Sequence, residues 1–179
     1  QRVAAGFDAH QRAHAAAIEG IDQEDRKAAR TVVMLGCSYA LHHPDEASAI
    51  WRVARAVCDG EIRAVRSCCG LPLHHAGDRS GAKRQAHALL DEVRDAESVV
   101  VADPGCAHHL SVTLPQISVA PQVTELLLDR LYANLDRMPA LTLAGERLRY
   151  HYPCQLGRGL GRYDEPRAVL ARLLGAPPA

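Results

Sequence analysis

The sequence predicts an α/β protein with an open, mostly parallel sheet and helices on both faces of the sheet. Two observations predict this class. From residue 31 onward, short runs rich in β-branched residues alternate with stretches of helical composition. A chain of 179 residues is also long enough to bury one sizeable core. Right-handed crossovers would then bring the carboxyl ends of the strands to one edge, where open α/β sheets bind their ligands.

The elements follow in order along the chain. Residues 1–30 are rich in Ala, Gln, Glu and Arg and predict one or two surface helices, with Gly20 as a stop signal. The predicted strands are Thr31–Leu35, Ile62–Arg66, Val99–Ala102, Ile117–Val119 and Leu148–Tyr152. The predicted helices lie near residues 45–58, 80–95, 121–136 and 165–174.

Charge and hydropathy exclude several classes of function. Acidic and basic residues are equal in number, 21 each, and form no basic block, so we expect neither a nucleic-acid partner nor a polybasic membrane anchor. No apolar run approaches the length of a membrane span, and the first residues lack a secretory signal. We therefore expect a cytoplasmic protein. The first residue is Gln1 rather than Met, so we expect the natural start to lie upstream.

The cysteines follow the predicted strands. In a cytoplasmic chain, six cysteines are better explained as ligands or redox groups than as a disulfide framework. Cys58 is the exception to the pattern, because it lies in a predicted helix and is interpreted as a buried thiol that packs. The cysteines at predicted strand exits are Cys37, Cys68, Cys69, Cys106 and Cys154.

The adjacent pair Cys68 and Cys69 is the most informative feature. Neighbouring side chains on a straight strand point to opposite faces, so the chain must turn for both sulfurs to reach one site. Gly70 permits such a turn. Gly36 and Gly105 precede Cys37 and Cys106 in the same way, and we expect these glycines to let the backbone approach an inorganic centre.

The wide spacing of the cysteines favours an iron–sulfur site over structural zinc. Structural zinc sites normally contain a close Cys-x-x-Cys pair, and this sequence has none. Zinc, or reduced thiols without metal, remain the alternatives for Cys37, Cys68, Cys69 and Cys106. The metal-free alternative includes a strained disulfide between Cys68 and Cys69 that acts as a redox switch.

These motifs resemble the cysteine-rich CCG domain family, found in a cysteine-rich component of heterodisulfide reductase and in the iron–sulfur subunits of glycolate oxidase and lactate-utilisation complexes. Residues 31–138 resemble one copy, after a helical lead-in over 1–30, and residues 139–179 resemble the start of a second, incomplete copy. The motifs that carry the resemblance are Leu35-Gly36-Cys37, Ser67-Cys68-Cys69-Gly70-Leu71-Pro72, Asp103-Pro104-Gly105-Cys106 and Tyr152-Pro153-Cys154.

The resemblance implies an iron–sulfur cluster of the 4Fe-4S type, with zinc in some copies, held by Cys37, Cys68, Cys69 and Cys106. The sequence departs from the family pattern at two places. His109 stands where the family has the last cysteine of a Cys-x-x-Cys motif, and no second Cys-Cys-Gly follows Cys154. His109 would supplement or shield the metal.

Three histidine pairs follow proposed ligand cysteines and are interpreted as nitrogen ligands, hydrogen-bond donors, proton carriers or ordinary loop residues. They are His42-His43, His74-His75 and His108-His109. Cys154 is the candidate substrate-facing thiol, because Arg158 and Arg162 nearby would lower its pKa.

The sequence has neither closely spaced ferredoxin-type cysteines nor a Gly-x-Gly-x-x-Gly fingerprint, so electrons would come from a partner. We therefore expect an iron–sulfur electron-transfer subunit of a cytoplasmic oxidoreductase, similar to heterodisulfide reductase or a 2-hydroxy-acid oxidase. It would form a hetero-oligomer with a flavoprotein or ferredoxin-like subunit. The alternatives are a metal-free or zinc-stabilised interaction domain, and a thiol–disulfide oxidoreductase that uses Cys68 and Cys69.

Overall fold

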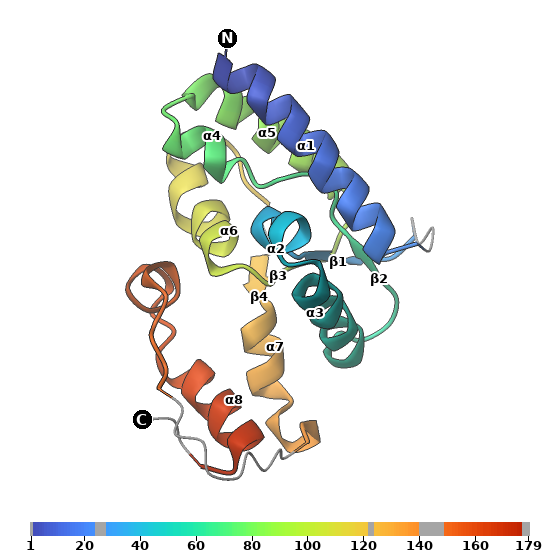
Figure 1. The fold of residues 1–179 in the computed structure, drawn as a ribbon, viewed down its shortest axis with the longest axis vertical. Coiled ribbons are helices and arrows are strands. Elements are labelled where there is room, and N and C mark those ends of the chain that lie inside the picture. The colour runs from blue at the N-terminus through green and yellow to red at the C-terminus, as the bar shows by residue number, and fades with distance from the viewer. Residues whose placement is uncertain (1, 24–27, 122–123, 140–148, 177–179) are drawn as a thin grey trace.

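The centre of the fold is a four-stranded sheet with the order β2-β1-β3-β4 (Figure 1). The computed structural model describes residues 2–23, 28–121, 124–139 and 149–176. All three strand pairings are parallel, with Val33 opposite Ala64, Met34 opposite Val101, and Val101 opposite Leu126. The strands are β1 (Thr31–Met34), β2 (Ile62–Ala64), β3 (Ser98–Val101) and β4 (Thr124–Leu126).

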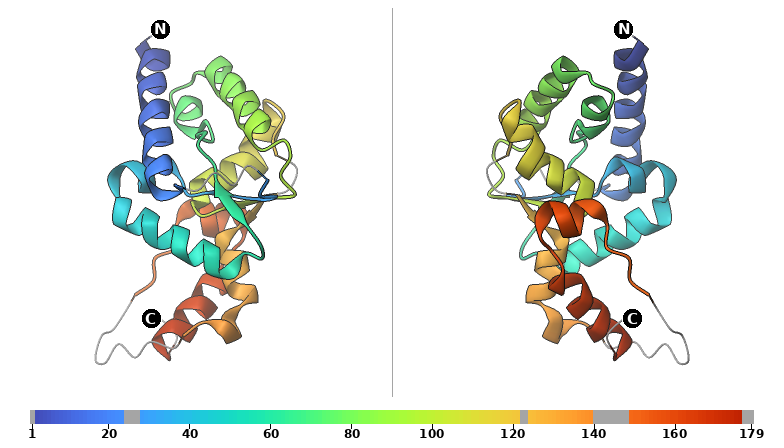
Figure 2. Two further views of the ribbon diagram at one scale, coloured as in Figure 1. Left: turned by 90° about the vertical axis from the view of Figure 1, so that its right-hand side faces the viewer. Right: turned by 90° about the vertical axis from the view of Figure 1, so that its left-hand side faces the viewer.

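Helices cover both faces of this sheet, as Figure 2 shows. The longer helices are α1 (Arg2–Ile21), α3 (Pro44–Val57), α5 (Arg79–Glu92), α7 (Leu127–Ala133) and α8 (Asp164–Leu174). Short helices are α2 (Cys37–His42), α4 (Leu71–His75), α6 (Pro104–His108), the π-helices η1 (His109–Thr113) and η4 (Gln155–Gly159), and the 3₁₀-helices η2 (Leu114–Gln116) and η3 (Leu135–Arg137). The predicted fold class, an open parallel sheet with helices on both faces, is confirmed.

Alternate strand residues divide the core into two clusters. Val32 and Met34 of β1 face one side, where they pack with Leu89 of α5 and Leu110 of η1. Val33 faces the other side, in a cluster that includes residues of α1, α3 and α7. This alternation follows from the pleat of a strand whose two faces are both covered.

Three predicted helices are confirmed within two or three residues, as α3, α5 and α8. The fourth, expected over 121–136, begins only at Leu127, because Thr124–Leu126 pairs with β3 as the edge strand. The strand predicted at Ile117–Val119 is wrong. The chain instead continues from α6 through η1 and η2, and the amides of Ile117 and Ser118 donate to the carbonyl of Leu114.

The strand predicted at Leu148–Tyr152 is also wrong for its described part. Leu148 lies outside the described residues, and residues 149–152 form no strand pairing. The chain there leads into η4, which packs against α6. Two tyrosines of this segment, Tyr150 and Tyr152, contact each other with ring centroids 4.8 Å apart.

The N-terminal prediction is confirmed as a single helix that ends one residue after Gly20. Helix α1 has a buried face, because His14 and Ile18 are each only 1% exposed. The Asp22 carboxylate, just beyond the helix, accepts a hydrogen bond of 2.8 Å from the amide of Ala64 in β2. Within the described residues, no helix combines the length and apolar composition that crossing a bilayer requires.

Candidate metal centre

Four cysteines lie at the carboxyl ends of neighbouring parallel strands, and we call this region the cysteine edge. Cys37 begins α2 after β1, and Cys106 lies in α6 after β3. Cys68 and Cys69 lie in the loop between β2 and α4. Because β2, β1 and β3 are adjacent and parallel, their exits meet at one edge of the sheet.

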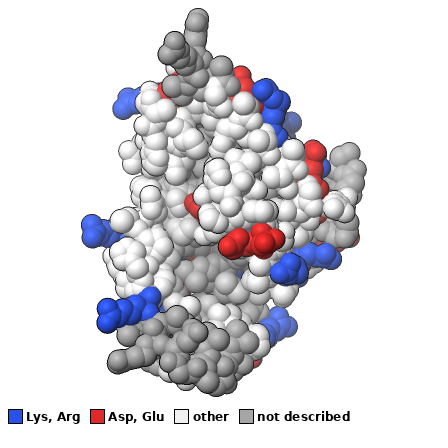
Figure 3. Space-filling view, in the orientation of Figure 1, with Lys and Arg blue, Asp and Glu red and all other residues white. Residues whose placement is uncertain are grey.

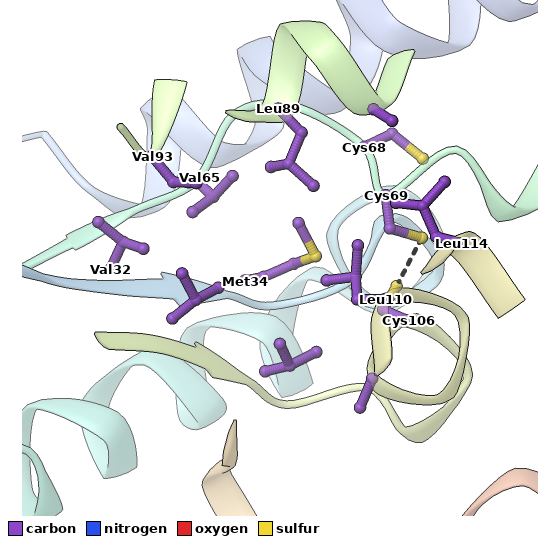
Figure 4. Packing of buried hydrophobic residues seen from close by; sticks show 14 of the residues in the cluster. Val32, Met34, Val65, Cys68, Cys69, Leu89, Val93, Cys106, Leu110 and Leu114 are labelled. Atoms are coloured by element: carbon purple, nitrogen blue, oxygen red, sulfur yellow. Dashed lines mark hydrogen bonds between the residues drawn. The ribbon is translucent and has the colours of Figure 1, made fainter. Parts of the chain in front are cut away.

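The four sulfurs form a series of neighbours. Cys37 Sγ and Cys68 Sγ lie within 4.8 Å of each other, and Cys68 affects the pKa of Cys37 as Cys69 affects that of Cys68. The Cys69 thiol donates to Cys106 Sγ over 3.2 Å, beside Leu110 and Leu114 (Figure 4). Cys68, Cys69 and Cys106 are buried, whereas Cys37 is half-buried. The chain therefore brings sulfurs from three strand exits close together.

The environment of these thiols raises the pKa of each one. The hydrogen bond with Cys68, followed by burial, raises the pKa of Cys37. For Cys68 the hydrogen bond with Cys37 lowers the pKa, but the bond with Cys69 and burial outweigh it and bring the pKa to about 12. The pKa of Cys69 is raised by its bond with Cys106 and by burial. In Cys106, burial and Asp103 outweigh the lowering of the pKa by Cys69.

These pKa directions distinguish two kinds of chemistry. A nucleophilic thiol needs surroundings that lower its pKa, and here the net effect of burial and of the neighbouring groups is to raise the pKa of each thiol. Four neighbouring thiols lose their protons together only when a metal cation replaces them, because a coordinated thiol is deprotonated outright. The donor set fits a thiolate metal centre better than a thiol–disulfide site.

Side chains of α5 hold the loop that bears Cys68 and Cys69 through hydrogen bonds to the backbone of that loop. The Glu92 carboxylate at the end of α5 accepts hydrogen bonds from the amides of Arg66 and Ser67, over 2.7 and 2.8 Å. Gln85 Nε2 donates to the carbonyl of Cys68 over 2.9 Å. Helix α5 therefore positions the vicinal cysteines, although its sequence contains no motif that predicts this role.

The glycines beside the cysteines serve the backbone and its packing. Gly36 has a φ of 100°, and a Cβ there would lie 2.7 Å from Cβ of Asp103. Gly70 has a φ of 88°, as expected for the turn after the cysteine pair, and its nearest side chain is Gln85. A Cβ at Gly105 would lie 2.9 Å from Asp103 Oδ1, the oxygen that accepts from the amide of Cys106. Their predicted contact with a cofactor stays a prediction.

One functional candidate comes from outside the predicted site. Ligand atoms of His10, Cys37 and Cys68 all lie within 4.8 Å of one another, the only such group of three in the described part of the chain. Burial, and next the nearby His42, lower the pKa of His10, so its ring is neutral at neutral pH. Sequence reasoning missed His10. The signal available was the helical spacing of Phe7, His10 and His14 on one face.

Two of the three histidine pairs meet at the cysteine edge. His109 is fully buried, neither of its ring nitrogens has a hydrogen-bond partner among the described residues, and its ring centroid lies 5.5 Å from that of His74. Burial, together with His74, His75 and His108, lowers the pKa of His109 to about 4. His109 is not part of the group formed by His10, and its role as a ligand stays a prediction.

The other two cysteines lie away from the sulfur series. Cys58, directly after α3, is buried in the second core cluster, which confirms that it packs. Cys154 is exposed and precedes η4. Arg162, expected to act on Cys154, forms an ion pair with Asp129 over 2.9 Å.

Comparisons with known proteins identify a family and several relatives of this chain. The model of the cysteine-rich domain family, CCG, matches residues 31–111 and 148–177. A component of the fumarate reductase (CoM/CoB) of Methanothermobacter marburgensis is 28% identical over 149 residues, 78% of this chain and 28% of that protein. Lactate utilization protein A of Oceanobacillus iheyensis is 26% identical over 136 residues, 68% of this chain and 54% of that protein.

A third relative is a component of the dihydromethanophenazine:CoB–CoM heterodisulfide reductase of Methanosarcina barkeri, 28% identical over 121 residues. The matched residues cover 60% of this chain and 29% of that protein. The chain thus spans between about a quarter and about half of the length of the curated relatives it matches. No solved structure matches it significantly. Because the family match spans more than half of the chain and includes all four cysteines of the edge, the chain belongs to the cysteine-rich CCG domain family.

Proposed function

We propose that this chain is an iron–sulfur electron-transfer subunit of an oxidoreductase, with Cys37, Cys68, Cys69 and Cys106 as ligands of a 4Fe-4S-type cluster. The observation that carries the proposal is the gathering of the four sulfurs, with Cys37 Sγ and Cys68 Sγ within 4.8 Å of each other and Cys69 Sγ 3.2 Å from Cys106 Sγ. Subunits of reductases and a lactate utilization protein among its relatives support a redox role.

The residues of the chain have separate tasks in this proposal. Such a cluster, when bound, accepts and releases single electrons. The buried thiols of Cys68, Cys69 and Cys106 would bind it away from water, while Cys37 lies at the more exposed side. Glu92 and Gln85 would keep the vicinal pair in place through the loop backbone.

The partner would dock over the cysteine edge. In the view of Figure 3, the surface over α2, α4 and α6 is largely uncharged, and a group of acidic side chains lies beside it, near the centre of the face. We propose a flavoprotein or ferredoxin-like subunit as the partner in a hetero-oligomer. We further propose a cytoplasmic site of action, because the six cysteines are all unpaired and that compartment keeps thiols reduced.

Anaerobic purification followed by iron and sulfide analysis tests the cluster. We expect iron and sulfide in near-equal amounts and broad absorbance near 400 nm, with Cys58→Ala as the matched control that retains both. Colourless, iron-free protein after anaerobic reconstitution would contradict the proposal.

A zinc-stabilised interaction domain is the second candidate, favoured by one observation. Zinc binds mixed nitrogen and sulfur ligands, and His10, Cys37 and Cys68 offer three such atoms within 4.8 Å of one another. Stoichiometric zinc, without iron, in the anaerobic preparation would establish this candidate instead.

A further inference from the structure

Helix α1 lies outside the part of the chain that matches the family, which begins at residue 31. It nevertheless packs against α2, α3 and α4, and it runs alongside the helices that follow β1 and β2 (Figure 1). A helix that merely precedes a domain need not contact its metal-binding loops. The contacts of α1 therefore call for a separate explanation.

One face of α1 is directed at the cysteine loop. Gln11 Oε1 accepts a hydrogen bond of 2.9 Å from the amide of Cys68, and Gln11 Nε2 donates to the carbonyl of Arg66, also over 2.9 Å. His14 Nδ1 lies 3.0 Å from the same carbonyl. Two consecutive turns of α1 thus hydrogen-bond the backbone on which the vicinal cysteines are mounted.

His10 extends this face to the sulfurs themselves. Its ring contacts Phe7, with ring centroids 5.7 Å apart, and shares the 4.8 Å group with Cys37 and Cys68. The Nε2 atom of His10 is buried and has no hydrogen-bond partner among the described residues. A histidine ring that has an unpartnered buried nitrogen and lies beside two thiols from different strand exits has the chemistry and placement of a ligand.

We propose that His10 is a metal ligand, which joins Cys37 and Cys68 around one metal ion of the centre. Gln11 and His14 are positioning residues, because they hold α1 over the loop through the Arg66 carbonyl and, for Gln11, the Cys68 amide. The inference rests on the proposed function for the cluster, but it requires only that this site binds metal. The N-terminal helix is then part of the centre rather than a lead-in to the domain.

The chemical consequence follows from the charge of the donor. A neutral imidazole adds no negative charge, whereas a thiolate ligand would add one. Histidine ligation raises the reduction potential of an iron–sulfur centre relative to thiolate ligation. The centre of this chain would therefore be easier to reduce than an all-cysteine site with the same protein surroundings.

Pulsed electron paramagnetic resonance tests the ligand directly. The full chain, with ¹⁵N-labelled histidine, is reconstituted anaerobically with ferrous iron and sulfide, and the cluster is reduced. All variants carry His109→Leu, so that the histidine of the predicted site does not contribute. We expect a strong nitrogen hyperfine coupling that His10→Ala abolishes and that His87→Ala, an exposed histidine on α5, retains.

His10→Cys covers the risk that the alanine variant fails to fold. It supplies a sulfur ligand, so we expect it to bind iron as the parent does, without the nitrogen coupling and with a lower reduction potential. A coupling that persists in His10→Ala or in His10→Cys would overturn the proposal.

Titration of the metal-free protein with Co²⁺ alone separates this inference from the proposed function. We expect His10→Ala to weaken Co²⁺ binding at least about tenfold. If the protein takes up Co²⁺ with this dependence but no iron and sulfide, the cluster proposal fails while His10 remains a ligand. If iron and sulfide bind, but His10→Ala changes neither the nitrogen hyperfine coupling nor the affinity for Co²⁺, only the inference about His10 fails. Protein that binds neither would overturn both.

Discussion

The cysteine edge and the C-terminal segment, residues 149–176, show what turns a cysteine into part of a site. Each region has a cysteine at a short helix: Cys106 lies within α6, and Cys154 lies directly before η4. Cys106 follows a paired strand and is buried against Cys69. Cys154 follows no strand pairing in the described chain and is exposed. The strand, rather than the cysteine motif, brings sulfurs together.

The C-terminal segment packs against the elements that bear the cysteine edge. Leu156 lies in the same core cluster as Cys69 and Cys106. A Cβ at Gly159 would lie 2.4 Å from Cδ2 of His108, so η4 approaches α6 closely. The segment therefore supports the cysteine edge from outside, and substitutions in the two regions should have different consequences.

The largest expected difference concerns metal content. Cys69→Ser removes the sulfur that contacts Cys106, so we expect iron content after anaerobic reconstitution to fall by more than half. Cys154→Ser should leave iron content and the absorbance near 400 nm unchanged. Equal losses in the two variants would show that the C-terminal segment does supply a ligand.

The second difference concerns backbone conformation. Gly36→Ala introduces a Cβ at positive φ against Asp103, so we expect the free energy of unfolding of the metal-free protein to fall by about 3 kcal/mol. Gly161→Ala, at a φ of 69° with open space around it, should cost only about 1 kcal/mol. Urea denaturation followed by circular dichroism measures both. Similar costs would mean that the contact with Asp103 is not what constrains Gly36.

The third prediction concerns pH. The pKa of His109 is about 4 in the folded protein and 6.5 ordinarily, so between these values the unfolded chain binds more protons. The contribution to stability is present above pH 6.5 and is lost as the pH falls toward 4. For the metal-free protein this amounts to about 2 kcal/mol at pH 5.

Urea denaturation at pH 7 and pH 5 measures this loss. His109→Leu should reduce the difference between the two pH values, whereas replacement of the exposed His151 in the C-terminal segment should not. An unchanged difference in His109→Leu would place the titrating group elsewhere.

The smallest effect is expected from the C-terminal ion pair. Arg162 and Asp129 are partly exposed, so Arg162→Ala should lower the free energy of unfolding by less than about 1 kcal/mol. Iron uptake should be unchanged. A larger loss, or a loss of iron, would show that the attachment of this segment to α7 determines the geometry of the cysteine edge.

The first three strands, the longer helices and the convergence of four cysteines could be predicted from the sequence, because periodicity and strand-exit position are local signals. The edge strand could not, since Ile117–Val119 has the stronger β-branched composition but lies after a run of helical turns. Hydrogen bonds between residues far apart in the chain could not be predicted either. Glu92 and Gln85 bond to a loop 17 to 26 residues away, and Gln11 reaches Cys68 across 57.

The hydrogen bonds of Glu92 have a consequence for how this sequence can change over time. Its carboxylate accepts hydrogen bonds from the main-chain amides of Arg66 and Ser67, so these bonds do not depend on the side chains at those positions. Any residue except proline can therefore stand at these two positions without loss of the hydrogen bonds, because proline alone has no amide hydrogen. Divergence at the position of Glu92 itself would remove two hydrogen bonds from the loop of the vicinal pair in a single step, unless another acceptor arises nearby.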